Sequence, residues 1–301
     1  MIKIGDIEII RIEEMMLAEP LASFAGIGNE ELLAQRSWHG PNFFNENEQS
    51  FVTSIHVWLV KTPKQIILVD TGGGNGKNRP LSPRFHMREV AFLKELANHG
   101  VNPEDVNLVL LTHLHVDHVG WNTMLVDGKW VPTFPNATYV ISAKEIEASD
   151  PKQGGASRPP GAQLPFIDSV EPIIDAGLVR LVEGNETITD GIDLMPIPGH
   201  SPGQIAVRIR SAGKEALFIA DTMHQPIQVY YPVVNSKYCN DQELARQTRA
   251  KVLAYAADHQ ALILPGHFGK PHAGYVERNG SDGFLFIPFK LNFDAKKQIG
   301  L

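Results

Sequence analysis

The segment that most constrains the fold runs from Val106 to Asn122, where an apolar run ends at a group of metal-binding side chains. Residues 109–111 are apolar, and such a run, when it stops abruptly, predicts a buried strand that reaches the edge of its sheet. In α/β layered proteins this edge usually holds the chemistry. A lone histidine would be read as a surface or capping residue, but this cluster predicts a metal site. Its members follow within six positions: His113, His115, Asp117 and His118.

Length and composition favour a soluble protein with a substantial core. The chain has 301 residues, 43% of them hydrophobic, and a formal net charge of −7. Dispersed Lys and Arg residues give no basic face for a nucleic acid. Cys239 is the only cysteine, so no disulfide framework is possible. The sequence shows neither signal-peptide features nor an apolar run near the roughly 18 residues that span a bilayer, and we therefore expect a cytoplasmic protein without membrane partners.

Hydrophobic patterning predicts strands and helices along the rest of the chain. Alternation predicts a first strand or hairpin over residues 2–13. Residues 84–99 have helical spacing, and Gly100 fits the position after a helix. The other expected elements are strands over 51–62 and 65–73, a strand and short helix over 137–149, short strands over 178–200, a hairpin over 204–221, a helix over 240–257 and a last buried strand over 261–265.

Two segments show no clear period. Residues 15–50 predict a lid, a pocket wall or a dimer contact, with plain surface packing as the alternative. Residues 150–165 contain four prolines and predict an irregular loop inside one domain, because candidate ligands lie on both sides of it. The side chains that favour a pocket wall or a homodimer contact in the first segment are Met15, Met16, Phe24, Trp38, Phe43 and Phe44.

The motif THLHVDH at residues 112–118 resembles the signature of the metallo-β-lactamase superfamily. The resemblance implies an α/β fold, a four-layer αβ/βα sandwich with metal at one edge of its paired sheets, in a single domain over residues 1–301. It also implies three further metal ligands in a fixed order. The sequence supplies His200 in PGHSPGQ, Asp221 in FIADTMH and His267 in LILPGHFG.

The superfamily pattern assigns a role to each candidate ligand. The first metal would be held by His113, His115 and His200. The second would be held by Asp117, His118 and His267, with Asp221 bridging the two ions. Imidazole and carboxylate ligands suit two Zn²⁺ ions, with iron or manganese as alternatives. A hydroxide shared by two ions about 3.5 to 4 Å apart would be the nucleophile, which makes Asp117 a catalytic as well as a metal-binding candidate.

A second carboxylate belongs to the same implied site. Asp70 ends a predicted strand in the sequence Asp-Thr-Gly-Gly. In the superfamily the equivalent Asp accepts a hydrogen bond from a metal-bound histidine and fixes its ring, so the resemblance implies that Asp70 supports the site without binding metal.

Absent features narrow the implied activity, which the fold alone does not decide. Only 34 residues follow His267, too few for the helical substrate domain of glyoxalase II-like thioesterases. No inserted domain separates Asp221 from His267, as it would in the nucleic-acid-cleaving branch. The classical zinc β-lactamases usually lack the Asp221-type bridge. The chain then most resembles the quorum-quenching acyl-homoserine lactonases and the methyl parathion hydrolase-like enzymes.

His224 stands where those lactonases carry a tyrosine, three residues after the bridging Asp. A neutral imidazole there can donate a hydrogen bond to an oxyanion or protonate a leaving oxygen, and a packing role is the alternative. We therefore expect a dinuclear metal-dependent hydrolase that opens a lactone or a similar small ester. Phosphotriester or aryl ester hydrolysis is the alternative, and a di-iron redox role would need a flavin domain.

The expected pocket follows from these assignments. Its walls should come from residues 15–50, from Trp121 and Met124, and from residues after Asp221, notably His224. We expect these walls to be mostly apolar or aromatic, without a cluster of Arg or Lys to clamp a phosphate. Such a pocket suits a small neutral ester ring.

Overall fold

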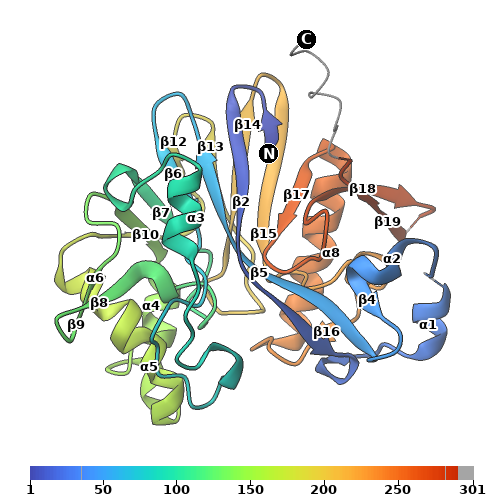
Figure 1. Cartoon of the computed structure of the whole chain (residues 1–301). Coiled ribbons are helices and arrows are strands. Elements are labelled where there is room, and N and C mark those ends of the chain that lie inside the picture. Colours follow the sequence, from blue (N-terminus) through green and yellow to red (C-terminus); the bar gives the residue numbers. More distant parts are fainter. Residues whose placement is uncertain (35, 282, 291–301) are drawn as a thin grey trace, which may run out of the picture.

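The computed structural model describes residues 1–34, 36–281 and 283–290; the side chains of residues 35–39, Trp38 among them, lie outside the described part. Two sheets face each other at the centre of the molecule (Figure 1). In its described part the first sheet has eight strands in the order β1-β2-β5-β6-β7-β10-β11, with β4 paired to β5. Its strands are β1 (Ile2–Ile4), β2 (Ile7–Pro20), β4 (Phe44–Asn45), β5 (Ser50–Lys61), β6 (Ile66–Val69), β7 (Leu108–Leu110), β10 (Thr138–Ser142) and β11 (Val179–Val182).

The second sheet is formed by the C-terminal half of the chain. Its seven described strands follow sequence order, apart from the omission of β16. They are β12 (Thr187–Thr189), β13 (Ile192–Pro196), β14 (Ile205–Ser211), β15 (Lys214–Ala220), β17 (Leu262–Pro265), β18 (Gly274–Asn279) and β19 (Gly283–Pro288). Two short pairs lie outside the sheets: β3 (Phe24–Ala25) with β16 (Asn235–Ser236), and β8 (Thr123–Val126) with β9 (Lys129–Pro132).

Helices cover the outer faces of both sheets (Figure 1). The helices are α1 (Asn29–Ala34), α2 (Arg36–Phe43), α3 (Phe92–Asn98), α4 (Ala143–Ser149), α5 (Pro160–Ser169), α6 (Glu171–Asp175), α7 (Ile227–Tyr230) and α8 (Gln242–His259). One apolar cluster joins the inner faces of the sheets, with Trp58 of β5 packed edge-to-face on Phe218 of β15. A second lies under α3, α5 and α6, and a third under α8. These layers form the predicted four-layer αβ/βα sandwich, which is confirmed.

The longest strand pair explains why part of the N-terminal segment lacked a period. β2 pairs with β5 from Glu8 to Pro20, but the register shifts between Glu13 and Met15. A bulge adds one residue to a strand and so displaces the alternation of its side chains. Residues 15–20 were expected to be irregular, and the structure corrects this: they continue the strand.

Three further expectations need correction. The helix predicted over 84–99 is shorter and consists of α3. Residues 86–91 are held against the preceding loop by hydrogen bonds. Met87 N–H donates to Lys77 O, and the Asn75 side chain pairs with the Val90 backbone. The loop predicted over 150–165 contains the start of α5, where Pro160 fits the first helical turn. The strand over 261–265 is not the last, since β18 and β19 follow.

The strand directions bring the candidate ligands to one edge. β6, β7 and β10 are parallel neighbours in the first sheet, and β15 and β17 are parallel in the second. The carboxyl ends of parallel strands meet at the same edge, so residues that follow them lie close together. Asp70 follows β6, His113 follows β7, Asp221 follows β15 and His267 follows β17.

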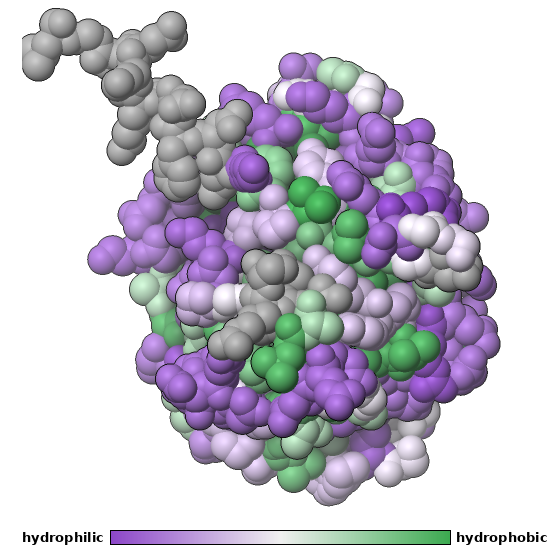
Figure 2. All heavy atoms as spheres, turned by 90° about the vertical axis from the view of Figure 1, so that its right-hand side faces the viewer, coloured by the Kyte–Doolittle hydropathy of each residue, from purple (hydrophilic) through white to green (hydrophobic). Residues whose placement is uncertain are grey.

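The outer surface is mostly hydrophilic on the face shown in Figure 2, where hydrophobic residues form small separate groups. In the described residues, no helix combines the length and apolarity needed to cross a bilayer.

Candidate metal centre

The loop after β7 carries four of the seven predicted ligands and is locked against the loop after β6. Gly120 N–H donates to Gly72 O at 2.7 Å, and Thr71 N–H donates to His118 O at 2.8 Å. A Cβ on Gly120 would lie 2.0 Å from the carbonyl carbon of Gly73, so only glycine permits this approach. The two loops therefore hold His118 and Asp70 in one rigid unit.

Two positions in this centre depart from ordinary backbone geometry. Asp70 has a φ of +60°, and Ala220, directly before Asp221, has a φ of +44°. Left-handed conformations of non-glycine residues cost free energy and concentrate at functional sites. In this chain each lies where a strand ends and a buried carboxylate turns into the site.

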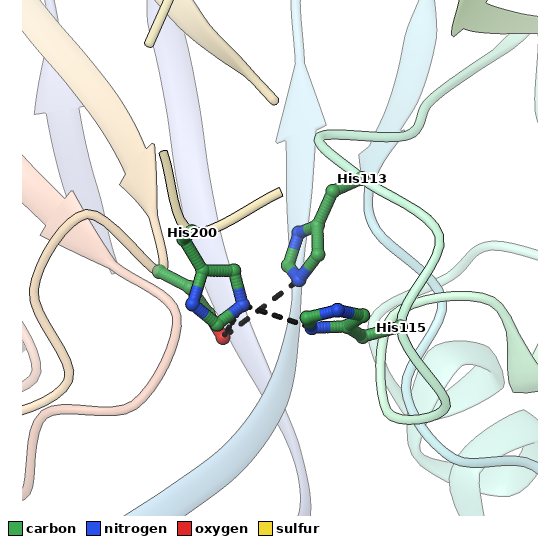
Figure 3. Close-up of side chains that lie close together, drawn as sticks. His113, His115 and His200 are labelled. Carbon is green, nitrogen blue, oxygen red and sulfur yellow. Dashed lines mark hydrogen bonds and ion pairs between the residues drawn. The ribbon is translucent and has the colours of Figure 1, made fainter. Parts of the chain in front are cut away.

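The seven predicted ligands form two adjacent groups. In each group, potential ligand atoms of its members lie within 4.8 Å of one another. His113 and His115 come from the loop after β7, His200 comes from the loop after β13, and the three rings converge (Figure 3). The first group is His113, His115, His200 and Asp221; the second is Asp117, His118 and His267.

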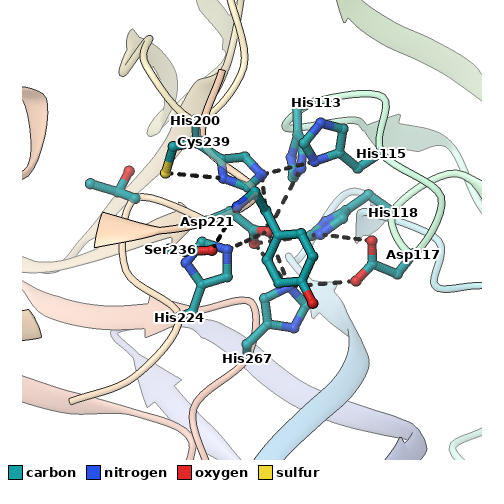
Figure 4. Close-up of polar contacts among 12 residues, drawn as sticks. His113, His115, Asp117, His118, His200, Asp221, His224, Ser236, Cys239 and His267 are labelled. Atoms are coloured by element: carbon teal, nitrogen blue, oxygen red, sulfur yellow. Dashed lines mark hydrogen bonds and ion pairs between the residues drawn. The ribbon is translucent and has the colours of Figure 1, made fainter. Parts of the chain in front are cut away.

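Asp221 lies between the two groups (Figure 4). Its Oδ2 is 3.3 Å from His200 Nε2 and 3.8 Å from His113 Nε2. Its Oδ1 is 3.1 Å from His267 Nε2 and 3.4 Å from His118 Nε2. Oδ2 also lies 3.2 Å from His267 Nε2, so the one carboxylate contacts both groups, as a carboxylate shared by two ions must.

Hydrogen bonds at the outer ring nitrogens orient the histidines. His118 Nδ1 lies 2.9 Å from Asp70 Oδ2, and His267 Nδ1 lies 3.0 Å from the Ser54 carbonyl oxygen. A carboxylate and a carbonyl oxygen are both acceptors, so Nδ1 of each ring carries a proton and Nε2 is left to face the site. Asp70 also accepts from the Thr112 backbone N–H at 2.8 Å, which fixes the carboxylate.

No sequence pattern pointed to Ser54 or Cys239 as part of the site. Ser54 acts through its backbone carbonyl, which any residue could supply. The Cys239 sulfur lies 3.7 Å from His200 Nδ1, on the side of the ring away from the metal-binding cluster. Burial raises the pKa of the Cys239 thiol to about 11, so it stays protonated, and its sulfur can accept a hydrogen bond from the Nδ1–H of a His200 ring whose Nε2 faces the cluster.

The histidines of the site fall into two classes by the direction in which their pKa is shifted. Burial lowers the pKa of His113 and of His200 well below the usual value, so both are neutral and able to bind a metal. Burial acts in the same direction on His267, but the Asp221 and Asp117 carboxylates outweigh it and raise its pKa to about 9. The pKa of His118 is also raised, by Asp221 and Asp70 against burial.

Several site atoms are buried without any hydrogen-bond partner among the described residues. They include His113 Nε2, His118 Nε2 and Asp221 Oδ1. An unsatisfied buried nitrogen or oxygen costs about 1 to 3 kcal/mol, and native proteins contain few of them. Their convergence on one point, with a donor set of imidazoles and carboxylates, fits divalent metal ions.

His224 lies beside this cluster and has no hydrogen-bonded ring nitrogen among the described residues. Its Nε2 is 3.3 Å from Asp221 Oδ2, and its ring stacks on His267 at 5.6 Å between centroids. The ring also lines the cavity above the cluster. His224 is therefore placed to face a molecule bound over the ligands.

The cavity over the cluster has a volume of about 600 Å³. Glu19 and Phe24 line it from residues 15–50, while Trp121 and Met124 do not. Trp121 is instead buried against Phe92, with its indole N–H donating to Glu14. The expectation for Trp121 and Met124 was wrong because both lie beyond the tight turn at Gly120, which directs the chain away from the cavity.

The expectation that the walls carry no cluster of Arg or Lys was also wrong. The wall is formed largely by residues 79–85 and 158–165, which the motifs do not include. These segments and the loop after β16 bring four cationic residues to the cavity: Arg79, Arg84, Arg158 and Lys237. Apart from Arg79 and Arg84 they are far apart in sequence, so the sequence showed no cluster of four charges.

Known proteins share this fold and family. Residues 51–267 match the metallo-beta-lactamase superfamily. The solved structure of hydrolase AbOPH, also of the beta lactamase superfamily, has 25% identity and a TM-score of 0.80, covering 96% of this chain and 97% of its own. The structure of AidC, a dizinc quorum-quenching lactonase bound to a product, has 25% identity and a TM-score of 0.75, with the same coverage.

A two-sheet sandwich with this ligand cluster and a match over residues 51–267 identifies the class. The chain belongs to the metallo-β-lactamase superfamily, and the predicted membership is confirmed. N-acyl homoserine lactonase AttM of Azorhizobium caulinodans is 29% identical to it over 188 residues, 54% of this chain. That alignment spans 62% of the relative's own length.

Proposed function

We propose that this chain is a metal-dependent hydrolase that holds two divalent ions and opens a lactone or a similar small ester. The observation that carries the proposal is the position of Asp221, with Oδ2 toward His200 and His113 and Oδ1 toward His267 and His118. Zinc suits the donor set best, with iron or manganese as alternatives. We further propose that residues 1–301 form one domain; a homodimer and a cytoplasmic location stay predictions.

The residues of the centre would have separate roles in the proposed reaction. Two ions held in the cluster would lower the pKa of water and polarise a carbonyl group. Asp117 and the five ligand histidines would hold the ions, Asp221 would bridge them, and Asp70 would orient His118. The His224 ring faces the cavity and would donate a hydrogen bond to the carbonyl oxygen as it gains charge, or protonate the leaving oxygen.

The cavity supports a small acyl substrate. Its lining includes Phe24, Ile55 and Phe85 above the metal-binding side chains. Sites for small ligands are mostly apolar with a few placed polar groups, and about 600 Å³ lies within their usual range. AttM is named an N-acyl homoserine lactonase and AidC a quorum-quenching lactonase, and both names agree with a lactone as substrate.

A substrate screen tests this function. Purified protein with a measured metal content would be assayed against lactones, aryl esters, phosphotriesters, phosphodiesters and β-lactams. We expect lactones to have the highest kcat/KM, with loss of activity in a chelator and recovery on adding zinc. Phosphotriester or phosphodiester hydrolysis without lactone hydrolysis would contradict the substrate class.

A further inference from the structure

We propose that Arg158 and Lys237 form a subsite for an anionic group of the substrate in the wall of the cavity. This inference rests on the proposed ester hydrolysis and narrows its substrate class. The substrate would be a lactone or ester that also carries a carboxylate or phosphate group away from the bond that breaks.

Two of the four cations in the wall are already neutralised. The Arg79 guanidinium is buried and forms two hydrogen bonds with Asp168, of 2.6 and 2.7 Å. Arg84 pairs with Glu19, whose side chain is also buried. These pairs fix the shape of the wall and leave little positive charge for a ligand.

The other two cations have much weaker partners. Lys237 Nζ is 4.0 Å from Glu19 Oε1, an oxygen that already accepts from Ser23 Oγ and Tyr238 OH. Its side chain is 55% exposed. Among the described residues the Arg158 guanidinium has no ion pair. Glu19 can offset only one charge, so Arg84, Arg158 and Lys237 leave an excess of two positive charges at the cavity.

The metal-binding cluster forms the floor of the cavity, and its carboxylates do not cancel this excess. Asp117 and Asp221 belong to the metal-binding cluster, where bound ions would more than neutralise them. A confined cavity with low-dielectric walls also focuses the field of its charges. The positive potential at Arg158 and Lys237 therefore persists when the cluster is loaded.

An anionic group is the ligand chemistry that these two side chains fit. Charge-assisted hydrogen bonds to a carboxylate or phosphate are about twice as strong as neutral ones, and guanidinium geometry matches both groups. Arg158 precedes α5 and Lys237 follows β16, so two separate segments bring a cation to one cavity. An uncharged substrate would leave Arg158 without an ion pair and Lys237 with only its long contacts to Glu19 and the Tyr238 ring.

Steady-state kinetics on matched substrates would test the subsite. The substrates are γ-lactones whose side chains have the same length and end in a carboxylate, a phosphate monoester or a primary amide. We expect the parent to prefer an anionic lactone, and the Arg158→Gln, Lys237→Gln double variant to raise its KM by about fivefold or more with little change in kcat. The amide should be unaffected, and Arg158→Lys should recover part of the loss.

A matched control removes one positive charge elsewhere. Lys214 is exposed at the β14–β15 turn and does not line the cavity. Lys214→Gln should leave the preference of the parent unchanged. Equal kcat/KM for the anionic and amide lactones in the parent, or an equal loss for both in the double variant, would overturn the subsite.

A binding measurement separates failure of the subsite from failure of the proposed function. Hexanoate, hexyl phosphate and 1-hexanol would be titrated calorimetrically into the metal-loaded parent and double variant. Weaker binding of hexanoate or of hexyl phosphate in the double variant, with 1-hexanol unchanged, supports the subsite and tells which anion it takes. Unchanged binding of both anions overturns it. If no ester is hydrolysed, the proposed function fails while this result still decides the subsite.

Discussion

The floor and the wall of the cavity hold their polar groups in different ways. On the floor, the His118 and His267 rings each have an outer nitrogen fixed by an acceptor and an inner nitrogen aimed at Asp221. In the wall, Lys237 has only a 4.0 Å contact with Glu19, Arg158 has no ion pair among the described residues, and both are partly exposed. Fixed side chains suit chemistry that is common to a superfamily, whereas adaptable ones suit the choice of a substrate. We therefore expect changes in the floor to abolish turnover and changes in the wall to alter selectivity.

Asp221 offers the strongest way to break this comparison. Asp221→Asn keeps the shape of the side chain but removes the charge that the two groups share. We expect kcat/KM to fall about a thousandfold, since bound metal supplies several kcal/mol of transition-state stabilisation. Asp190→Asn, in an exposed turn, is the control. A variant with parental turnover would show that Asp221 does not organise the centre.

His224 lies beside the metal-binding cluster and also lines the cavity, so a variant tests whether it belongs with the floor or with the wall. His224→Ala should lower kcat about a hundredfold, the usual effect of losing one donor to an oxyanion, and leave the metal content unchanged. Metal analysis and steady-state kinetics of the same sample would separate the two effects. Full activity would make His224 a packing residue.

Asp70 sharpens the account of how the floor is held. Asp70→Asn replaces the acceptor of His118 Nδ1, and loss of such a partner typically costs about 10- to 100-fold in metal affinity or activity. Competition with a chelator would measure the affinity alongside turnover. If both match the parent, Asp70 has no role in orienting the ring.

The last effect is on the free energy of unfolding, through a lysine that contacts Asp168, the partner of Arg79 in the wall. Lys77 is buried, with Nζ 2.6 Å from Thr123 Oγ1 and 3.7 Å from Asp168 Oδ1. Burial, partly offset by Asp168, lowers its pKa from 10.5 to about 7. Between these pH values the unfolded chain binds more protons than the folded one, so stability rises with pH, by up to about 1.4 kcal/mol per unit.

Lys77→Met would remove the part of the rise in stability with pH that Lys77 causes. Urea unfolding at pH 7 and pH 9 should show the parent gaining stability relative to the variant as the pH rises. A difference in the free energy of unfolding that stays constant over this range would mean that Lys77 keeps its proton in the folded chain.

The sequence predicted the residues of the floor much better than those of the wall. His113 to His118 form a local motif after a buried strand, and the resemblance it carries led to Asp221 and His267. The wall has no such motif. Arg84, Arg158 and Lys237 meet only because three distant segments fold over the same cavity, and no periodicity reports this.

The fold shows the same limit. The sandwich followed from the resemblance that the motif carries, and β14 and β15 were predicted as a hairpin. The extension of β2 was hidden by its bulge, and α5 was hidden because Pro160 at a helix start resembles a proline in a loop. Local rules fail where a tertiary contact or a single added residue changes the pattern.

We infer that Asp221 joins two metal-binding groups into one centre. The most direct test is the metal content of the purified chain after it is loaded with zinc and the excess is removed. We predict two ions per chain. A single tightly held ion per chain would contradict the claim.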